Sequence, residues 1–199
     1  IKTCIMKAKI VLVVMVLFIA SCAQVKQLTN LLNCDFRVSN VDNVNMAGVD
    51  VSKIKSFTDL KLMDGVNLLA AVAKGTLPLN LTVNIEAKNP NTQMAALNKL
   101  DWILLIDDVE MANGTTTKRV EVPPNNGTGI FPIQVTTDLA KVLSGQSAKN
   151  IVNFGLNLAG YGSRPTRIAV KAKPTILIGG AAIMYPGYIT IKSEYGGVN

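Results

Sequence analysis

The feature that most constrains this sequence is a stretch in which apolar and polar side chains alternate strictly. From Leu79 to Lys88 the chain reads LNLTVNIEAK, with an apolar residue at every odd position and a polar one at every even position. Side chains on a β-strand point alternately to opposite faces, so the pattern predicts a strand with one buried face. Asn89-Pro90-Asn91 ends it, because proline has no N–H for the sheet and disfavours helix in the residue before it.

Further strands are predicted along the chain. The run Leu100–Asp107 is apolar on both faces, as expected of a central strand under a helix or a second sheet. Turns are predicted after it at Asp107-Asp108 and at Asn113-Gly114. Shorter runs between turn signals predict strands at Arg37–Val41, Met46–Ile54, Thr117–Val122, Phe131–Val135, Arg167–Ile178 and Tyr188–Lys192.

Two helical segments interrupt this pattern. Apolar residues near helical spacing predict a helix over Val66–Lys74, with Gly75 just past its end. A second begins after the capping residues Thr137 and Asp138 and continues as Ala148–Leu158. Because strands and helices do not alternate, we expect a mainly β fold over residues 35–199. It is an antiparallel fibronectin/immunoglobulin-like β-sandwich with two helical insertions, preceded by a signal-peptide helix.

The amino terminus has the layout of a secretory signal. Lys7 and Lys9 give a basic start, and Ile10–Ile19 is an uninterrupted apolar run. The run is too short for a transmembrane helix, which needs about 20 apolar residues. The tetrapeptide that follows, Ile19-Ala20-Ser21-Cys22, closely resembles a bacterial lipobox. We therefore expect residues 1–21 to be a lipoprotein signal peptide.

The lipobox resemblance implies that Cys22 carries a diacylglycerol thioether and that the membrane is a partner through this lipid. Two chains give stable anchoring, where one gives only marginal binding. Residues 22–34 would form a tether. Neither an aspartate nor an acidic cluster follows Cys22, and the lack of such sorting signals implies the periplasmic face of the outer membrane.

The charge distribution argues against nucleic acid as a partner. Removing Lys2, Lys7 and Lys9 with the signal peptide leaves 17 basic and 13 acidic residues, a net charge of +4. The basic residues are scattered and aromatic residues make up only 5% of the chain. Nucleic-acid surfaces concentrate positive charge, often with stacking aromatic side chains.

The sequence also lacks the motifs of common enzymes. It contains no histidine, which excludes histidine-dependent triads and histidine metal sites. It has no phosphate-binding loop, dinucleotide fingerprint or nucleophile elbow. The carboxylates of Asp107, Asp108 and Glu110 cluster, but they are expected to be turn residues or solvated charges rather than a catalytic pair or a calcium site. We predict no enzyme activity, no cofactor and no metal site.

Several other residues have a structural and a functional interpretation. Cys34 has no cysteine to pair with in the mature chain and is expected to be a small apolar residue, since no histidine can activate it. Trp102 is expected in the core rather than as a ligand platform. Tyr185, Tyr188 and Tyr195 are expected to pack on the sheet; an exposed contact patch is the alternative.

The segment Leu79–Leu143 resembles the late-embryogenesis-abundant type 2 family, also called the water-stress and hypersensitive-response (WHy) domain. The matching features, in order, are the alternating strand, Asn89-Pro90-Asn91, the apolar strand ending at Asp107, Gly114, Val122-Pro123, and Phe131–Val135 before Asp138-Leu139. The resemblance implies a small fibronectin-like sandwich and no catalytic residues. The extended form resembles that of Bacteroidetes-type lipoproteins.

The expected function is a non-catalytic, lipid-anchored envelope protein that acts as a structural, binding or stress-protection module. Its partner would be an envelope protein or polymer. The alternative is a periplasmic carrier of a lipid or another apolar ligand, held in a cavity between the sheet and the helices. An apolar cavity would distinguish the two.

Overall fold

The computed structural model describes residues 29–51, 61–142, 144, 166–178 and 181–195. The lipobox Ile19–Cys22 and the predicted helix Ala148–Leu158 lie outside these residues. In the described part of the chain, no helix is long and apolar enough to cross a membrane.

The alternating stretch forms the centre of the first sheet. Strand β3 (Pro78–Asn89) pairs with β1 (Asp35–Met46) on one side and β8 (Gly127–Asp138) on the other, and β2 (Val49–Asp50) adds to β1. Every pairing is antiparallel, and β3 and β8 run in unbroken register from Pro78↔Asp138 to Asn89↔Gly127. From Leu79 to Lys88 the apolar side chains are buried and the polar ones are exposed or half-buried, as the sequence predicts.

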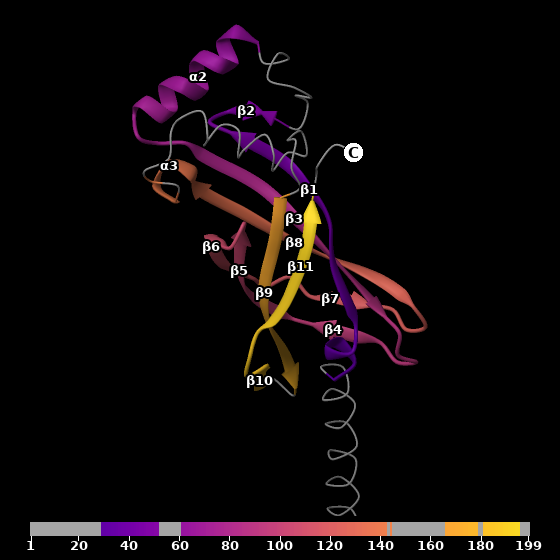
Figure 1. Cartoon of the computed structure of the whole chain (residues 1–199). Helices are drawn as coiled ribbons and strands as arrows, with labels where there is room; N and C mark the ends of the chain where they lie inside the picture. The colour runs from indigo at the N-terminus through magenta and orange to yellow at the C-terminus, as the bar shows by residue number, and fades with distance from the viewer. Residues whose placement is uncertain (1–28, 52–60, 143, 145–165, 179–180, 196–199) are drawn as a thin grey trace, which may run out of the picture.

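The second sheet is built around β9 (Thr166–Ile178). Strand β5 (Lys99–Ile106) pairs with one side of β9 and continues to β6 (Val109–Thr116). On the other side, β11 (Ile189–Tyr195) and β10 (Ala181–Met184) pair with successive parts of β9. A separate pair joins β4 (Ala95–Leu97) to β7 (Val120–Val122). The fold is therefore a mainly β, antiparallel sandwich, whose two sheets cross in Figure 1.

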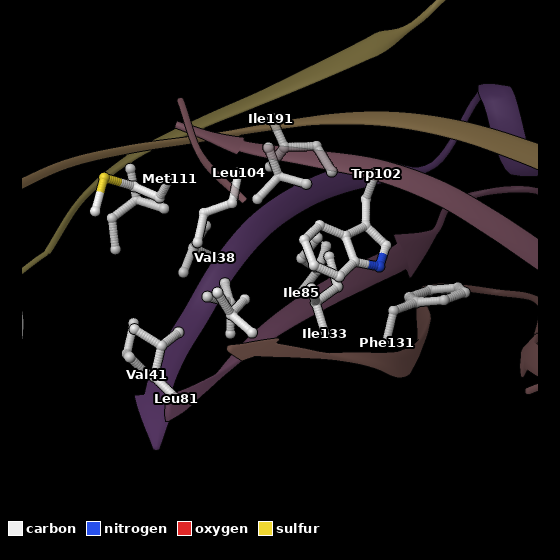
Figure 2. Packing of buried hydrophobic residues seen from close by; sticks show 14 of the residues in the cluster. Val38, Val41, Leu81, Ile85, Trp102, Leu104, Met111, Phe131, Ile133 and Ile191 are labelled. Carbon is white, nitrogen blue, oxygen red and sulfur yellow. The ribbon is translucent and has the colours of Figure 1, made fainter. Parts of the chain in front are cut away.

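The core lies between the two sheets. Figure 2 shows Val38, Ile85 and Ile133 of the first sheet facing Trp102 and Ile191 of the second. Along β5, alternate residues from Leu100 to Ile106 are buried, and the residues between them are half-buried. Burial of apolar area is the main favourable term in folding, so this interface holds the sandwich together.

Strand β1 reaches the same core with an irregular pattern. Its buried residues are Val38, Val41, Val44 and Met46, which are not evenly spaced by two. Register shifts against β3 fall between Val38 and Asn40 and between Asp42 and Asn45. Bulges of this kind insert extra residues into a strand, and they explain why β1 has no strict alternation in its sequence. The predicted strand Arg37–Val41 lies within β1, whereas Met46–Ile54 contains the end of β1, the turn at Ala47-Gly48 and β2.

The predicted turn at Asn113-Gly114 is wrong. Both residues lie inside β6, and the β5–β6 turn is made by Asp107-Asp108 alone, both with positive φ. Gly114 pairs with Trp102, whose indole ring occupies the space where a side chain would stand: an added Cβ would lie 2.6 Å from the ring carbon Cζ2. The glycine therefore serves close packing rather than chain reversal.

The helix prediction at Val66–Lys74 is confirmed by α2 (Leu62–Ala73). Gly75 has a φ of 73° and follows the helix end. Its N–H donates to Val72 O, and the Thr76 N–H donates to Ala71 O, which is the hydrogen-bond pattern of a glycine-terminated helix. The cap prediction at Asp138 also holds: its carboxylate accepts from the N–H of Ala140 at the start of the short α3 (Leu139–Val142).

Replacing Gly114 with alanine should destabilise the protein, because the new methyl group collides with the buried Trp102 ring. We expect the free energy of unfolding, measured with urea, to fall by about 1–3 kcal/mol. Gly65→Ala is the matched control: nothing lies within 4 Å of its Cβ position, and alanine in a helix is favoured over glycine by about 0.5–1 kcal/mol. Equal effects of the two substitutions would contradict this packing.

Candidate functional site

The predicted turn motif contains a fully buried polar side chain that makes four hydrogen bonds. Asn89 ends β3 with 0% of its surface exposed. Its Nδ2 donates to Gln93 O at 2.9 Å and to Val122 O at 3.0 Å. Its Oδ1 accepts from the N–H of Asn91 at 3.0 Å and from Asn91 Nδ2 at 2.7 Å. A primary amide has two donors and two acceptor positions, so Asn89 is fully satisfied.

The neighbouring Asn91 extends this network to the start of the described chain. Its Nδ2 also donates to Asn30 O at 2.9 Å, while Asn30 Nδ2 donates to Met94 O at 3.3 Å. Leu31 and Cys34, which follow Asn30 in the chain, are buried. The last part of the predicted tether is therefore held against the sandwich by the motif.

The loop between β7 and β8 completes the junction. Asn125 and Asn126 both adopt positive φ, which asparagine tolerates better than most residues. Their N–H groups donate to Asn91 O at 2.8 Å and to Asn89 O at 2.7 Å. We call this network of Asn30, Asn89, Asn91, Asn125 and Asn126 the asparagine junction.

The asparagine junction joins three segments that are far apart in the sequence: residues 29–34, the β3–β4 loop and the β7–β8 loop. Sequence reasoning found the motif and its place at the end of β3, and it missed Asn30, Asn125 and Asn126. The Asn-Asn-Gly of residues 125–127 was the available signal, because asparagine and glycine favour positive φ. The polar groups of the asparagine junction form hydrogen bonds with one another, so the junction has a structural role.

The acidic cluster holds a turn, as expected. Arg167 Nη2 lies 3.0 Å from Asp108 Oδ2, and its Nε lies 3.5 Å from Asp107 Oδ1. The Asp107 carboxylate also accepts the backbone N–H of Arg167 at its Oδ1, at 3.2 Å, and the Asp107 N–H donates to the Arg167 carbonyl at 2.8 Å. Glu110 accepts from Asn113 instead. Across the described residues, no three Cys, Asp or Glu side chains come together to hold a metal ion.

The described aromatic residues have different environments. Trp102 is buried between the sheets, as expected. Tyr188 is exposed and lies under Lys173, whose Nζ is 5.7 Å from the ring centre. Tyr185 is half-buried, and its N–H donates to Pro174 O at 2.9 Å. The side chain of Tyr195 lies outside the described part.

The lone thiol is shielded. Cys34 is buried and its Sγ donates to Asn30 O at 3.3 Å. Burial, with a smaller effect of the Asp35 carboxylate, raises the pKa of the thiol to about 11. The reactive form of cysteine is the thiolate, so Cys34 is unreactive at neutral pH and acts as an apolar residue.

A carrier would need an apolar cavity large enough for its ligand. An apolar cavity between the sheets is lined by Leu31, Phe36, Leu97 and Pro174 among others, and has a volume of about 20 Å³. That is room for about one water molecule, whereas small-molecule pockets occupy about 300–1,000 Å³. This cavity does not accommodate a lipid. The place predicted for a ligand, between the sheet and the helices Val66–Lys74 and Ala148–Leu158, lies partly outside the described residues.

Comparisons with known proteins add little. A scan against protein-family models and a search of curated proteins find no match to this chain. Among solved structures, a protein from Archaeoglobus fulgidus is similar over 61% of this chain and 87% of its own, with 17% identity and a TM-score of 0.35. A second, described as a late embryogenesis abundant (LEA) protein, is similar over 96% and 88%, with 13% identity and a TM-score of 0.36. The second shares the broad LEA description with the family that the segment Leu79–Leu143 resembles.

Asn89→Ala should destabilise the protein strongly, because it leaves buried carbonyl and N–H groups without partners. We expect a loss of about 3 kcal/mol in the free energy of unfolding. Asn80→Ala, on the exposed face of the same strand, should change it by no more than about 0.5 kcal/mol. Similar values for both variants would show that the junction contributes little.

The shielding of Cys34 predicts a pH dependence. The folded state favours the neutral thiol, so this contribution to stability is fully present below pH 9.0, the ordinary value for the group, and is lost as the pH rises through about 11. Over this range, urea unfolding should show wild-type stability falling more steeply than that of Cys34→Ala. Parallel curves would contradict the raised pKa.

Proposed function

We propose that this protein is a non-catalytic, lipid-anchored protein of the bacterial cell envelope, held through Cys22 at the periplasmic face of the outer membrane. Its sandwich acts as a structural or binding module, and the WHy resemblance implies a role in stress protection. The amino-terminal signal features and the lipobox supply the argument for the anchor.

The structural observation that supports this proposal is the attachment of residues 29–34 to one end of the sandwich. Leu31 is 1% exposed, and Asn30 is hydrogen-bonded to both Asn91 and Met94. Thr29 follows Cys22 by seven residues, a span of at most about 25 Å. A lipid at Cys22 would therefore hold a defined end of the domain close to the membrane.

The outward face of the first sheet suits a binding role. Its exposed and half-buried positions carry amide and hydroxyl groups, with Asn84 Nδ2 donating to Asp42 at 2.7 Å and Thr136 donating to Asn80 at 2.8 Å. Arg37 on this face is paired with Glu86 at 2.9 Å. Such a face offers hydrogen bonds with little net charge, which fits a neutral, hydroxyl-rich envelope polymer better than a nucleic acid.

The intact mass of membrane-extracted protein tests the anchor. The wild type should have the mass of residues 22–199 plus its acyl chains, because cleavage before Cys22 and lipidation occur together. Cys22→Ala should lose this modification. Cys34→Ala is the matched control and should keep it, since that thiol is buried.

A wild-type protein that is recovered unmodified and in the soluble fraction would overturn the lipid anchor and the localisation. If the wild type is lipidated and Cys34→Ala also loses the modification, the assignment of the lipid to Cys22 is wrong.

A further inference from the structure

The outward face of the second sheet carries a hollow. Side chains along a strand alternate between the two faces of a sheet. The buried residues of β5, β9 and β11 point into the core, so the residues between them point outward. On this face a hollow of about 240 Å³ is lined by Asp101, Ile103, Asn113, Thr115 and Tyr188 among others. We call it the Tyr188 hollow. Its volume lies just below the range of about 300–1,000 Å³ of small-molecule sites, so it suits a ligand group the size of one sugar ring.

Tyr188 gives this hollow an aromatic wall. Among the aromatic side chains that the structure describes, only that of Tyr188 is exposed, at 49%. An aromatic ring carries partial negative charge on its face and partial positive charge at its edge. The C–H groups of a sugar ring are slightly positive and therefore pack favourably on such a face. The phenol hydroxyl adds a group that can donate or accept a hydrogen bond.

The other side of the hollow offers polar groups with unused capacity. Asp101 accepts hydrogen bonds from the Thr115 hydroxyl and from Lys99 Nζ, whereas a carboxylate has about four acceptor positions. Asn113 Nδ2 donates to Glu110 at 3.1 Å. No described residue is bonded to the Asn113 side-chain oxygen, so it can accept from a ligand. An aromatic wall opposite a carboxylate and an amide suits the apolar ring and the hydroxyls of a sugar.

Two lysines beside the hollow favour a sugar that carries negative charge. Lys173 is the cross-strand partner of Asp101, and Lys171 is that of Ile103. The two lysines are about 7 Å apart along β9, and neither forms an ion pair with a carboxylate of the described residues. Lys173 Nζ lies 5.7 Å from the centre of the Tyr188 ring. A sugar carboxylate at this place would be near both ammonium groups and would relieve their repulsion.

A second hollow on the same face favours a polymer over a single sugar. Its volume is about 350 Å³, and its lining includes Arg167, Ala169, Lys192 and Glu194. Lys192 follows Tyr188 by four residues, about 14 Å along a strand. Arg167 is paired with Asp108 at 3.0 Å, and Lys192 stands beside Glu194 on β11 with one residue between them. The second hollow is therefore nearly neutral, and it suits the hydroxyls of a neighbouring sugar unit.

We propose that the outward face of the second sheet binds an acidic polysaccharide, with one sugar ring in the Tyr188 hollow. The ring packs against Tyr188, its hydroxyls bond to Asp101 and Asn113, and its carboxylate lies at Lys171 and Lys173. The polymer continues along β11 toward the second hollow. This inference extends the proposed binding role to a second face of the sandwich, and it does not depend on the lipid anchor.

Calorimetric titration of the full-length protein in detergent tests the ligand class. The probes are a short oligogalacturonate and the same oligosaccharide with its carboxylates reduced to alcohols. We expect the acidic form to bind several-fold more tightly, because only its carboxylates interact with the two lysines. Absence of binding by both forms would overturn the proposal, and the intact-mass test of the anchor would be unaffected.

Three substitutions test the position of the site. Tyr188→Ala should weaken the binding of both oligosaccharides several-fold, whereas Tyr188→Phe should retain it, because the ring remains. The double variant Lys171→Gln/Lys173→Gln should reduce the affinity for oligogalacturonate to that of the reduced form. Lys88→Gln is the matched control, because Lys88 is an exposed lysine on the outward face of the first sheet; it should leave both affinities unchanged.

Two results would contradict this position. If Tyr188→Ala binds oligogalacturonate as tightly as the wild type does, the contact depends on charge alone and the sugar site is wrong. If Lys88→Gln weakens binding as much as the double lysine variant does, the second sheet is not the specific site. Urea unfolding of each variant, which should match the wild type because these side chains are on the surface, excludes loss of the fold as the cause.

Discussion

The buried amide of Asn89 is the interaction on which the irregular end of this sandwich depends. It stands where β3 leaves the sheet, and it holds the carbonyls of Gln93 and Val122 with its amino group. A buried polar group is costly when unpaired, whereas a fully paired one fixes a single arrangement of its surroundings. Through Asn91 the same group determines the position of residues 29–34. One side chain thus links three segments that are far apart in the sequence.

The two ends of the sandwich differ in chemistry. One end has the asparagine junction, the short β4–β7 pair and the apolar β9–β10 hairpin, and the other has α2 with its exposed Leu62 and Met63. The sheets between them are held by apolar side chains and are polar outside. The two ends of the domain can therefore be distinguished by their chemistry. A lipid at Cys22 would place the end with the asparagine junction nearer to the membrane.

Much of the fold follows from local patterns. The alternation from Leu79 to Lys88, the glycine after α2 and the cap at Asp138 each depend on residues that are neighbours in sequence, and the structure confirms them. Features that depend on residues far apart in the sequence could not be predicted from local patterns. The partners of Asn89 come from residues 93 and 122, and the bulges of β1 are defined only by its register with β3. Gly114 was assigned to a turn because the space it leaves for Trp102 depends on a cross-strand pair.

The asparagine junction also changes how the domain responds to mechanical force. Among the described strands, β1 pairs on its other side with the two-residue β2, so a pull on the amino-terminal chain would separate β1 from β3 one residue pair at a time. Asn91 and Met94 form hydrogen bonds with Asn30, which precedes the first residue of β1. Tension is therefore passed first to the β3–β4 loop, and these two hydrogen bonds must break before force acts on β1.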